Sequence, residues 1–169
     1  QRRPDPKLVA DAFVKLGWIE QLDGERERAL ELWEEGAARC EEVGFTWMQA
    51  SAVMSAADMA DELGRTELAH QRARDALHLS RKCDDRQFTL FALALLARLA
   101  AKAGQADRAG RLWGAIETEE SRAPVGQWES QRDELASNVL TPSAEFEHGL
   151  SSGRSLSLEE AVEYALGED

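Results

Sequence analysis

Apolar and polar residues follow one another along this chain with the period of amphipathic helices, in which apolar side chains recur every three or four positions. The first such stretch has apolar residues at Leu8, Val9, Ala12, Phe13, Leu16 and Ile19. A later stretch has them at Leu90, Leu93, Leu96, Ala97 and Ala100. Ala, Leu, Glu and Arg recur throughout and only four prolines occur, which favours helices over strands. The pattern therefore predicts an all-α fold.

Small residues return along the chain with a period of forty positions. Glycine occurs at Gly24, Gly64 and Gly104. Five positions later stand Ala29, Ala69 and Ala109, and seven positions before the glycines stand Gly17, Ala57 and Ala97. A period between about 20 and 50 residues is typical of a solenoid, in which each repeat buries its apolar face against the next one.

Each repeat is predicted to be a pair of helices joined by a turn at the glycine, because glycine accepts the positive φ that ends a helix. The expected pairs cover residues 6–44, 45–84 and 85–123. The small residues allow the two helices of a pair to approach closely. Gly110 and Gly114 extend this smooth surface in the third pair.

The sequence of residues 124–169 does not follow the repeat, and its pattern predicts three shorter helices. Trp128 to Val139 forms the first, Thr141 caps the second, and Gly153 ends it. Ser157 then stands three positions before Glu160, the spacing of a capping box that begins a helix. Because repeat arrays need a capped end, we expect residues 124–169 to pack on residues 1–123 as a helical cap.

The repeats resemble the tetratricopeptide repeat, which has a small residue, a turn glycine, an alanine and an aromatic in this order. Gly17, Gly24, Ala29 and Trp33 fit, and so do Ala97, Gly104, Ala109 and Trp113, whereas the middle repeat has Ala73 in place of the aromatic. The resemblance implies a right-handed solenoid of three helix pairs with a short C-terminal helical cap. The period of forty exceeds the usual length of about 34 residues, so longer helices are expected.

A second resemblance is carried by the segments RAGRLWGA at 108–115 and GRSLSLEEAV at 153–162. They look like the C-terminal end of bacterial multidomain signalling ATPases and transcriptional regulators of LuxR or AfsR type, some of which are linked to cyclases. This implies a protein-interaction or effector-sensing role in signal transduction or transcription regulation. The alternatives are a scaffold attached to a nucleotide cyclase or ATPase module, and an oligomerisation module. Because the chain starts at Gln1, we interpret it as part of a longer protein.

The net charge is −12, and residues 125–169 carry two basic and ten acidic groups. Such a surface repels phosphate backbones, so we expect no direct binding of nucleic acid. No apolar run reaches the roughly 20 residues that a membrane helix needs. The cysteines, Cys40 and Cys83, are too few for a disulfide framework, which favours a reducing, cytoplasmic setting.

Motifs that carry chemistry are missing from the sequence. It has no phosphate-binding loop and no metal-ligand spacing, and its histidines are scattered. The segment at residues 149–153 spells a nucleophile elbow, but that motif works only between a strand and a helix, and we interpret it as a loop at a helix end. Asp58 and Asp61 share a helix face, which we interpret as solvated. We therefore expect no catalytic activity of its own, no cofactor and no metal.

The first helix of each pair is the expected place for recognition, because repeat arrays bind partners on such surfaces. The expected partner is a protein, a peptide or another domain of the same polypeptide. The candidate groove residues are Asp11, Val14, Trp18, Met54, Asp58, Asp61, Phe91 and Arg98. A mixture of aromatic, methionine and charged side chains is typical of interfaces. The alternative is that Trp18, Met54 and Phe91 are core residues.

Overall fold

The computed structural model describes residues 5–167, and within that range every regular element is a helix. The prediction of an all-α fold is therefore confirmed for the described part of the chain. The chain divides into two compact units, residues 1–85 and residues 86–169. None of the helices in the described part combines the length and the apolar character that crossing a bilayer requires.

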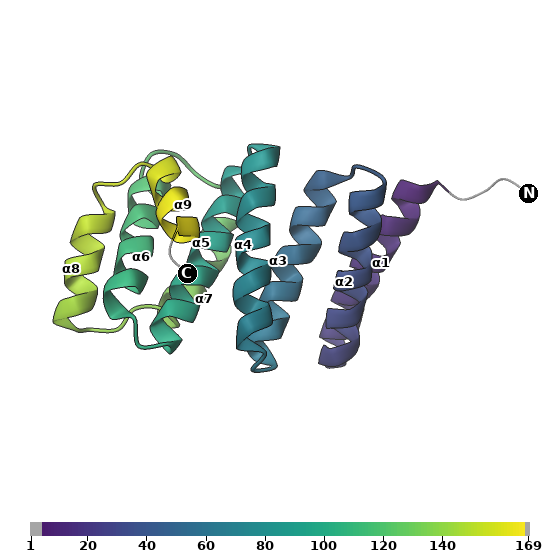
Figure 1. Ribbon diagram of the computed structural model, residues 1–169, viewed down its shortest axis with the longest axis horizontal. Coiled ribbons are helices and arrows are strands. Elements are labelled where there is room, and N and C mark those ends of the chain that lie inside the picture. The colour runs from purple at the N-terminus through teal and green to yellow at the C-terminus, as the bar shows by residue number, and fades with distance from the viewer. Residues whose placement is uncertain (1–4, 168–169) are drawn as a thin grey trace, which may run out of the picture. The chain divides into compact units, whose positions relative to one another are not determined.

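The first unit consists of four helices of similar length, each packed against the next one along the chain (Figure 1). They are α1 (Pro6–Leu22), α2 (Arg26–Glu42), α3 (Thr46–Glu62) and α4 (Thr66–Cys83). Gly24 joins α1 to α2 with φ of +84°, and Gly64 joins α3 to α4 with φ of +71°. The turns thus lie at the glycines, as the sequence predicts, because a side chain would strain this backbone conformation.

The contact between α1 and α2 depends on a glycine facing an indole. A Cβ atom added to Gly17 would lie 2.5 Å from Nε1 of Trp33, so the ring occupies the space that a side chain would need. The same Nε1 donates a hydrogen bond to the carbonyl oxygen of Val14 at 3.2 Å. Ala29 of α2 and Ala69 of α4 are fully buried, in keeping with their prediction as packing positions.

The second unit contains five helices. They are α5 (Arg86–Lys102), α6 (Ala106–Glu120), α7 (Trp128–Ser137), α8 (Ala144–Gly153) and α9 (Leu158–Gly167). Gly104 forms the turn between α5 and α6 with φ of +74°. Helix α7 packs on α5, α8 packs on α6, and α9 contacts both α5 and α6, so residues 124–167 share one unit with the third helix pair.

Glycines bring the backbones of α6 and α8 into direct contact. A Cβ atom on Gly110 or Gly114 would collide with the carbonyl oxygens of Phe146 or Leu150, and one on Gly149 would collide with that of Asp107. The smooth face of α6 therefore lies against α8, whereas the sequence assigned it to the contact within the third pair. The segment at residues 149–153 belongs to helix α8, so the prediction of a loop there was wrong.

The ends of the short helices follow their caps. Ser143, not Thr141, begins α8: its backbone is extended and its hydroxyl accepts a hydrogen bond from the Phe146 N–H at 3.1 Å. At α9 the predicted capping box is present. The Ser157 N–H donates to Glu160 at 2.8 Å, and the Glu160 N–H donates to the Ser157 hydroxyl at 3.2 Å.

Candidate functional site

Trp18 of α1 links the first helices of the first two pairs, α1 and α3, on the side where the sequence places the groove. Its Nε1 donates a hydrogen bond to the Ser55 hydroxyl of α3 at 3.3 Å, while 36% of the residue remains exposed. Met54 and Asp58, which precede and follow Ser55 on α3, are half-buried. The structure thus brings an accessible indole to the α3 segment that carries a thioether and a carboxylate.

Three further groove candidates of this unit are less accessible. Val14 is fully buried at the contact between α1 and α2, so its side chain belongs to the core and cannot reach a partner. Asp11 is half-buried and accepts a hydrogen bond from the Lys15 ammonium at 2.6 Å. Asp61 is buried, with 9% of its surface exposed. The accessible part of the candidate surface therefore centres on Trp18.

The two candidates of the second unit have different surroundings. Phe91 is half-buried and meets the Trp128 ring of α7 edge-on, with ring centroids 5.4 Å apart. Trp128 also contacts Trp113, and its Nε1 donates to Glu120 at 2.8 Å. The chain's own helix α7 thus supplies the aromatic partner of Phe91. Arg98 is half-buried on α5.

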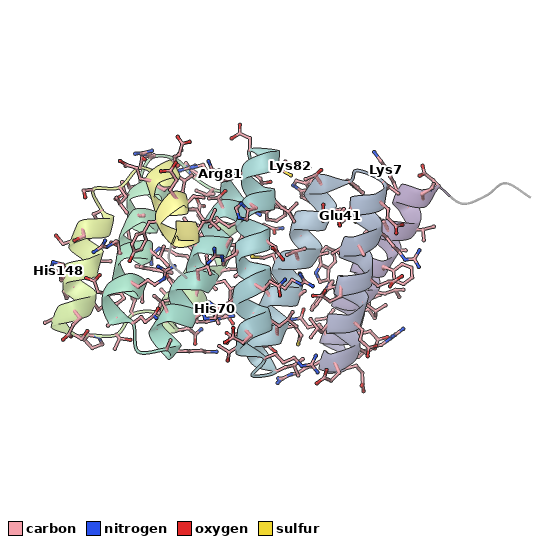
Figure 2. All side chains as sticks on the ribbon, in the orientation of Figure 1. Lys7, Glu41, His70, Arg81, Lys82 and His148 are labelled. Carbon is pink, nitrogen blue, oxygen red and sulfur yellow. The ribbon has the colours of Figure 1, made fainter. Side chains whose placement is uncertain are left out.

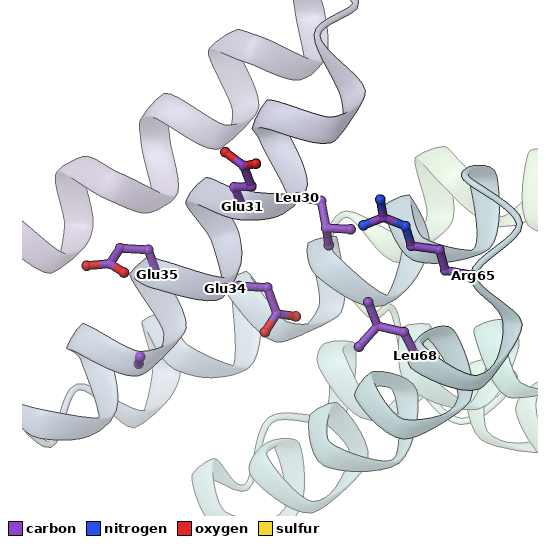
Figure 3. A pocket seen from close by; sticks show the side chains of 7 residues that line it. Leu30, Glu31, Glu34, Glu35, Arg65 and Leu68 are labelled. Atoms are coloured by element: carbon purple, nitrogen blue, oxygen red, sulfur yellow. The ribbon is translucent and has the colours of Figure 1, made fainter.

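A hollow between α2 and α4 was not predicted from the sequence (Figure 3). Its volume is about 530 Å³, and it opens to solvent. Its lining combines apolar and acidic side chains with one arginine: Leu30, Glu31, Glu34, Glu35, Ala38, Arg65 and Leu68. Opposite charges 38 positions apart, at Glu27 and Arg65 and at Glu34 and Arg72, were the signal that could have indicated this contact.

Arginine already holds the acidic wall of this hollow. Both oxygens of Glu34 accept hydrogen bonds from the Arg72 guanidinium, at 2.7 Å and 2.6 Å. This bond to Glu34 raises the pKa of Arg72 above its usual value despite the burial of the guanidinium, so the guanidinium stays charged. The ion pair ties α2 to α4, and Glu31 and Glu35 lie at the rim of the hollow. We therefore interpret the hollow as a contact between two helices that stabilises the fold.

Metal-binding clusters do not occur in the described part of the chain, where no group of three or more His, Cys, Asp or Glu residues is suitably placed. Figure 2 shows His70 on α4 and His148 on α8, which belong to different units. The His148 ring contacts the Asp107 carboxylate at 2.7 Å between Nδ1 and Oδ1. That pair joins α8 to α6 at the surface.

Both cysteines are free thiols. Burial raises the pKa of Cys40, and the nearby charge of Asp11 raises it further. The pKa of Cys83 is raised by burial and by Asp85. Because the thiolate is the reactive form, neither environment activates the sulfur as a nucleophile.

Comparison of the chain with protein-family models, with curated proteins and with solved structures finds no match. The candidate surface therefore rests on the repeat register and on the geometry around Trp18.

Proposed function

We propose that this chain is a tetratricopeptide-like, right-handed solenoid of three helix pairs with a helical cap, and that it recognises a protein or peptide. In this proposal it acts as the interaction or effector-sensing domain of a larger bacterial regulator. The forty-residue period, the turn glycines and the buried alanines support the proposed architecture. The regulatory context rests on the resemblance of its C-terminal segments alone.

One observation carries the proposed recognition: Trp18 is partly exposed although its indole N–H is bonded across α1 and α3. Indole rings that are fixed by one polar contact and otherwise accessible are frequent anchors of interfaces, since they bury a large area at small entropic cost. Met54 and Asp58 supply apolar and acidic neighbours on α3. An extended peptide with an apolar side chain is the ligand that this surface suits best.

The test is selection of peptides from a random display library on the full chain, followed by binding measurements with fluorescently labelled hits. Trp18→Ala should weaken binding roughly tenfold or more, as expected for a truncated anchor. Trp47→Ala is the matched control, because Trp47 stands eight positions, about two helical turns, before Ser55 on α3 and is not part of the contact between Trp18 and Ser55. It is 48% exposed and also donates its indole N–H, to Asp85 at 3.0 Å. It should leave binding unchanged.

Thermal melting of the two variants separates recognition from packing. Truncating a core tryptophan to alanine lowers the free energy of unfolding of a protein by about 3–5 kcal/mol, whereas truncating a surface anchor lowers it much less. If Trp18→Ala melts far below Trp47→Ala, Trp18 is a core residue and the proposal fails. It fails equally if the library yields no peptide whose affinity depends on Trp18.

A further inference from the structure

Helix α1 carries an apolar stripe that no part of the described chain covers. We call the residues Leu8, Ala12, Leu16 and Ile19 the α1 edge; their spacing places them on one face of the helix. Leu8 is 66% exposed, Leu16 45% and Ile19 52%, and Ala12 is exposed as well. Exposed apolar residues that form a continuous stripe indicate an interaction site more strongly than scattered ones do.

The same face of α3 is covered by α2. Forty positions after the α1 edge stand Met48, Ala52, Ala56 and Met59, which are 7%, 0%, 1% and 1% exposed. All four belong to a core cluster that also contains Leu30, Trp33 and Cys40 of α2. The packing of α2 on α3 therefore shows which kind of element this face accepts.

The positions that correspond to this stripe on the first helix of the third pair are buried as well. On α5 its members are Phe88, Ala92, Leu96 and Leu99, and all are buried. Among the first helices of the three pairs in the described residues, α1 alone presents this stripe to solvent.

We infer that the α1 edge is a docking site for the second helix of a further helix pair. Repeat modules bury their apolar faces against the neighbouring module, and the face in question is the one that α3 presents to α2. The occupant is an amphipathic helix with the apolar chemistry of α2, in which Leu30, Ala37 and Cys40 supply large and small residues to the shared core. This site is distinct from Trp18; the inference rests on the helix-pair architecture of the proposed function and not on the recognition of a peptide.

Leu22 provides a matched control on the same helix. It is the most exposed of the large hydrophobic residues, at 87%, and the corresponding position of α3 is the exposed Glu62. The register therefore excludes Leu22 from the docking face although it is apolar. A glutamate at position 22 should be tolerated wherever the α1 edge is covered, whereas a glutamate at position 16 should not.

The experiment duplicates residues 6–45 in tandem within the full chain, so that a copy of α2 precedes the original α1. Leu16→Glu and Leu22→Glu are introduced into the original α1, both in the parent and in the extended chain. In the parent, both substitutions lie at exposed positions and should change Tm little. In the extended chain, Leu16→Glu should lower Tm by roughly 5 °C or more beyond its effect in the parent, and Leu22→Glu should not.

Two results would overturn the inference. If Leu16→Glu has the same effect on Tm in both chains, the α1 edge does not accept a helix of the chemistry of α2. Sedimentation of the parent tests another occupant. If the parent self-associates and Leu16→Glu abolishes that association while Leu22→Glu does not, a second copy of this chain covers the edge instead.

Discussion

Replacing Gly110 by alanine adds one methyl group at the place where α6 meets the backbone of α8. The new Cβ atom would collide with the carbonyl oxygen of Phe146 and would lie 2.9 Å from the backbone nitrogen of Leu150. Both atoms belong to the main chain of a helix, so no change of side-chain rotamer can relieve the contact. The two helices have to move apart, which also loosens the contacts at Gly114 and Gly149.

The expected magnitude follows from two opposing effects. Alanine favours a helix over glycine by about 1 kcal/mol, which would stabilise an open position. Overpacking typically costs about 1–3 kcal/mol, and the upper end applies here because backbone atoms cannot yield locally. The free energy of unfolding should therefore fall by about 2 kcal/mol. For a protein of this size that corresponds to a decrease in Tm of roughly 4–8 °C.

Thermal and urea denaturation, followed by circular dichroism, measure this change. Gly167→Ala on α9 is the control, since a Cβ atom there would meet nothing within 4 Å. No neighbouring atom has to move, so Gly167→Ala should leave Tm close to that of the parent, whereas Gly110→Ala should lower it. If Gly110→Ala melts at or above the temperature of the parent, the backbones of α6 and α8 are not in contact and this account of the second unit is wrong.

Two further predictions concern a packing position and a helix cap. Ala69→Leu should lower the free energy of unfolding by about 1–3 kcal/mol, because Ala69 is fully buried. Ala38→Leu, at an exposed position of α2, should not lower it. Equal midpoints of urea denaturation for the two variants would mean that the repeat register is wrong. Hydrogen bonds from the backbone N–H and the side chain of Ser157 lower the pKa of Glu160 below 4.5. Since the folded-state pKa is depressed, the stabilisation is present above about pH 4.5 and is lost as the pH falls through the folded-state pKa. In an NMR titration, Ser157→Ala should raise the pKa of Glu160 only part of the way to 4.5, because the backbone N–H at position 157 remains; an unchanged pKa would contradict the role of the hydroxyl.

Local chemistry made much of the fold predictable. Gly24, Gly64 and Gly104 mark the turns because a positive φ excludes most side chains, and this requirement is visible in one sequence. The capping box at Ser157 is equally local, since donor and acceptor lie three residues apart. Thr141 was a less reliable signal, because Ser143, two positions later, offers the same chemistry with the backbone conformation that a cap requires.

Features that depend on distant segments were not predictable in the same way. Periodicity places Gly110 and Gly114 on a smooth face, but it does not say which helix covers that face. Likewise, Phe91 acquires its aromatic neighbour from Trp128 of α7, a helix without a defined place in the repeat pattern. Val14 illustrates a third limit: groove and core positions adjoin on a helix, and only the packing of α2 assigns this residue to the core.

The glycine-rich side of α6 and the α1 edge differ in whether a further helix can pack on them. The glycine-rich side of α6 is covered by α8, which lies so close that not even a methyl group fits between the two backbones. Another helix cannot dock on that side of α6 without displacing α8. The α1 edge, in contrast, presents Leu8, Leu16 and Ile19 to solvent in the register that α3 uses against α2. Each unit therefore differs at its edge: in the first unit the α1 edge is exposed to the helix that we infer, and in the second unit α8 covers the smooth side of α6.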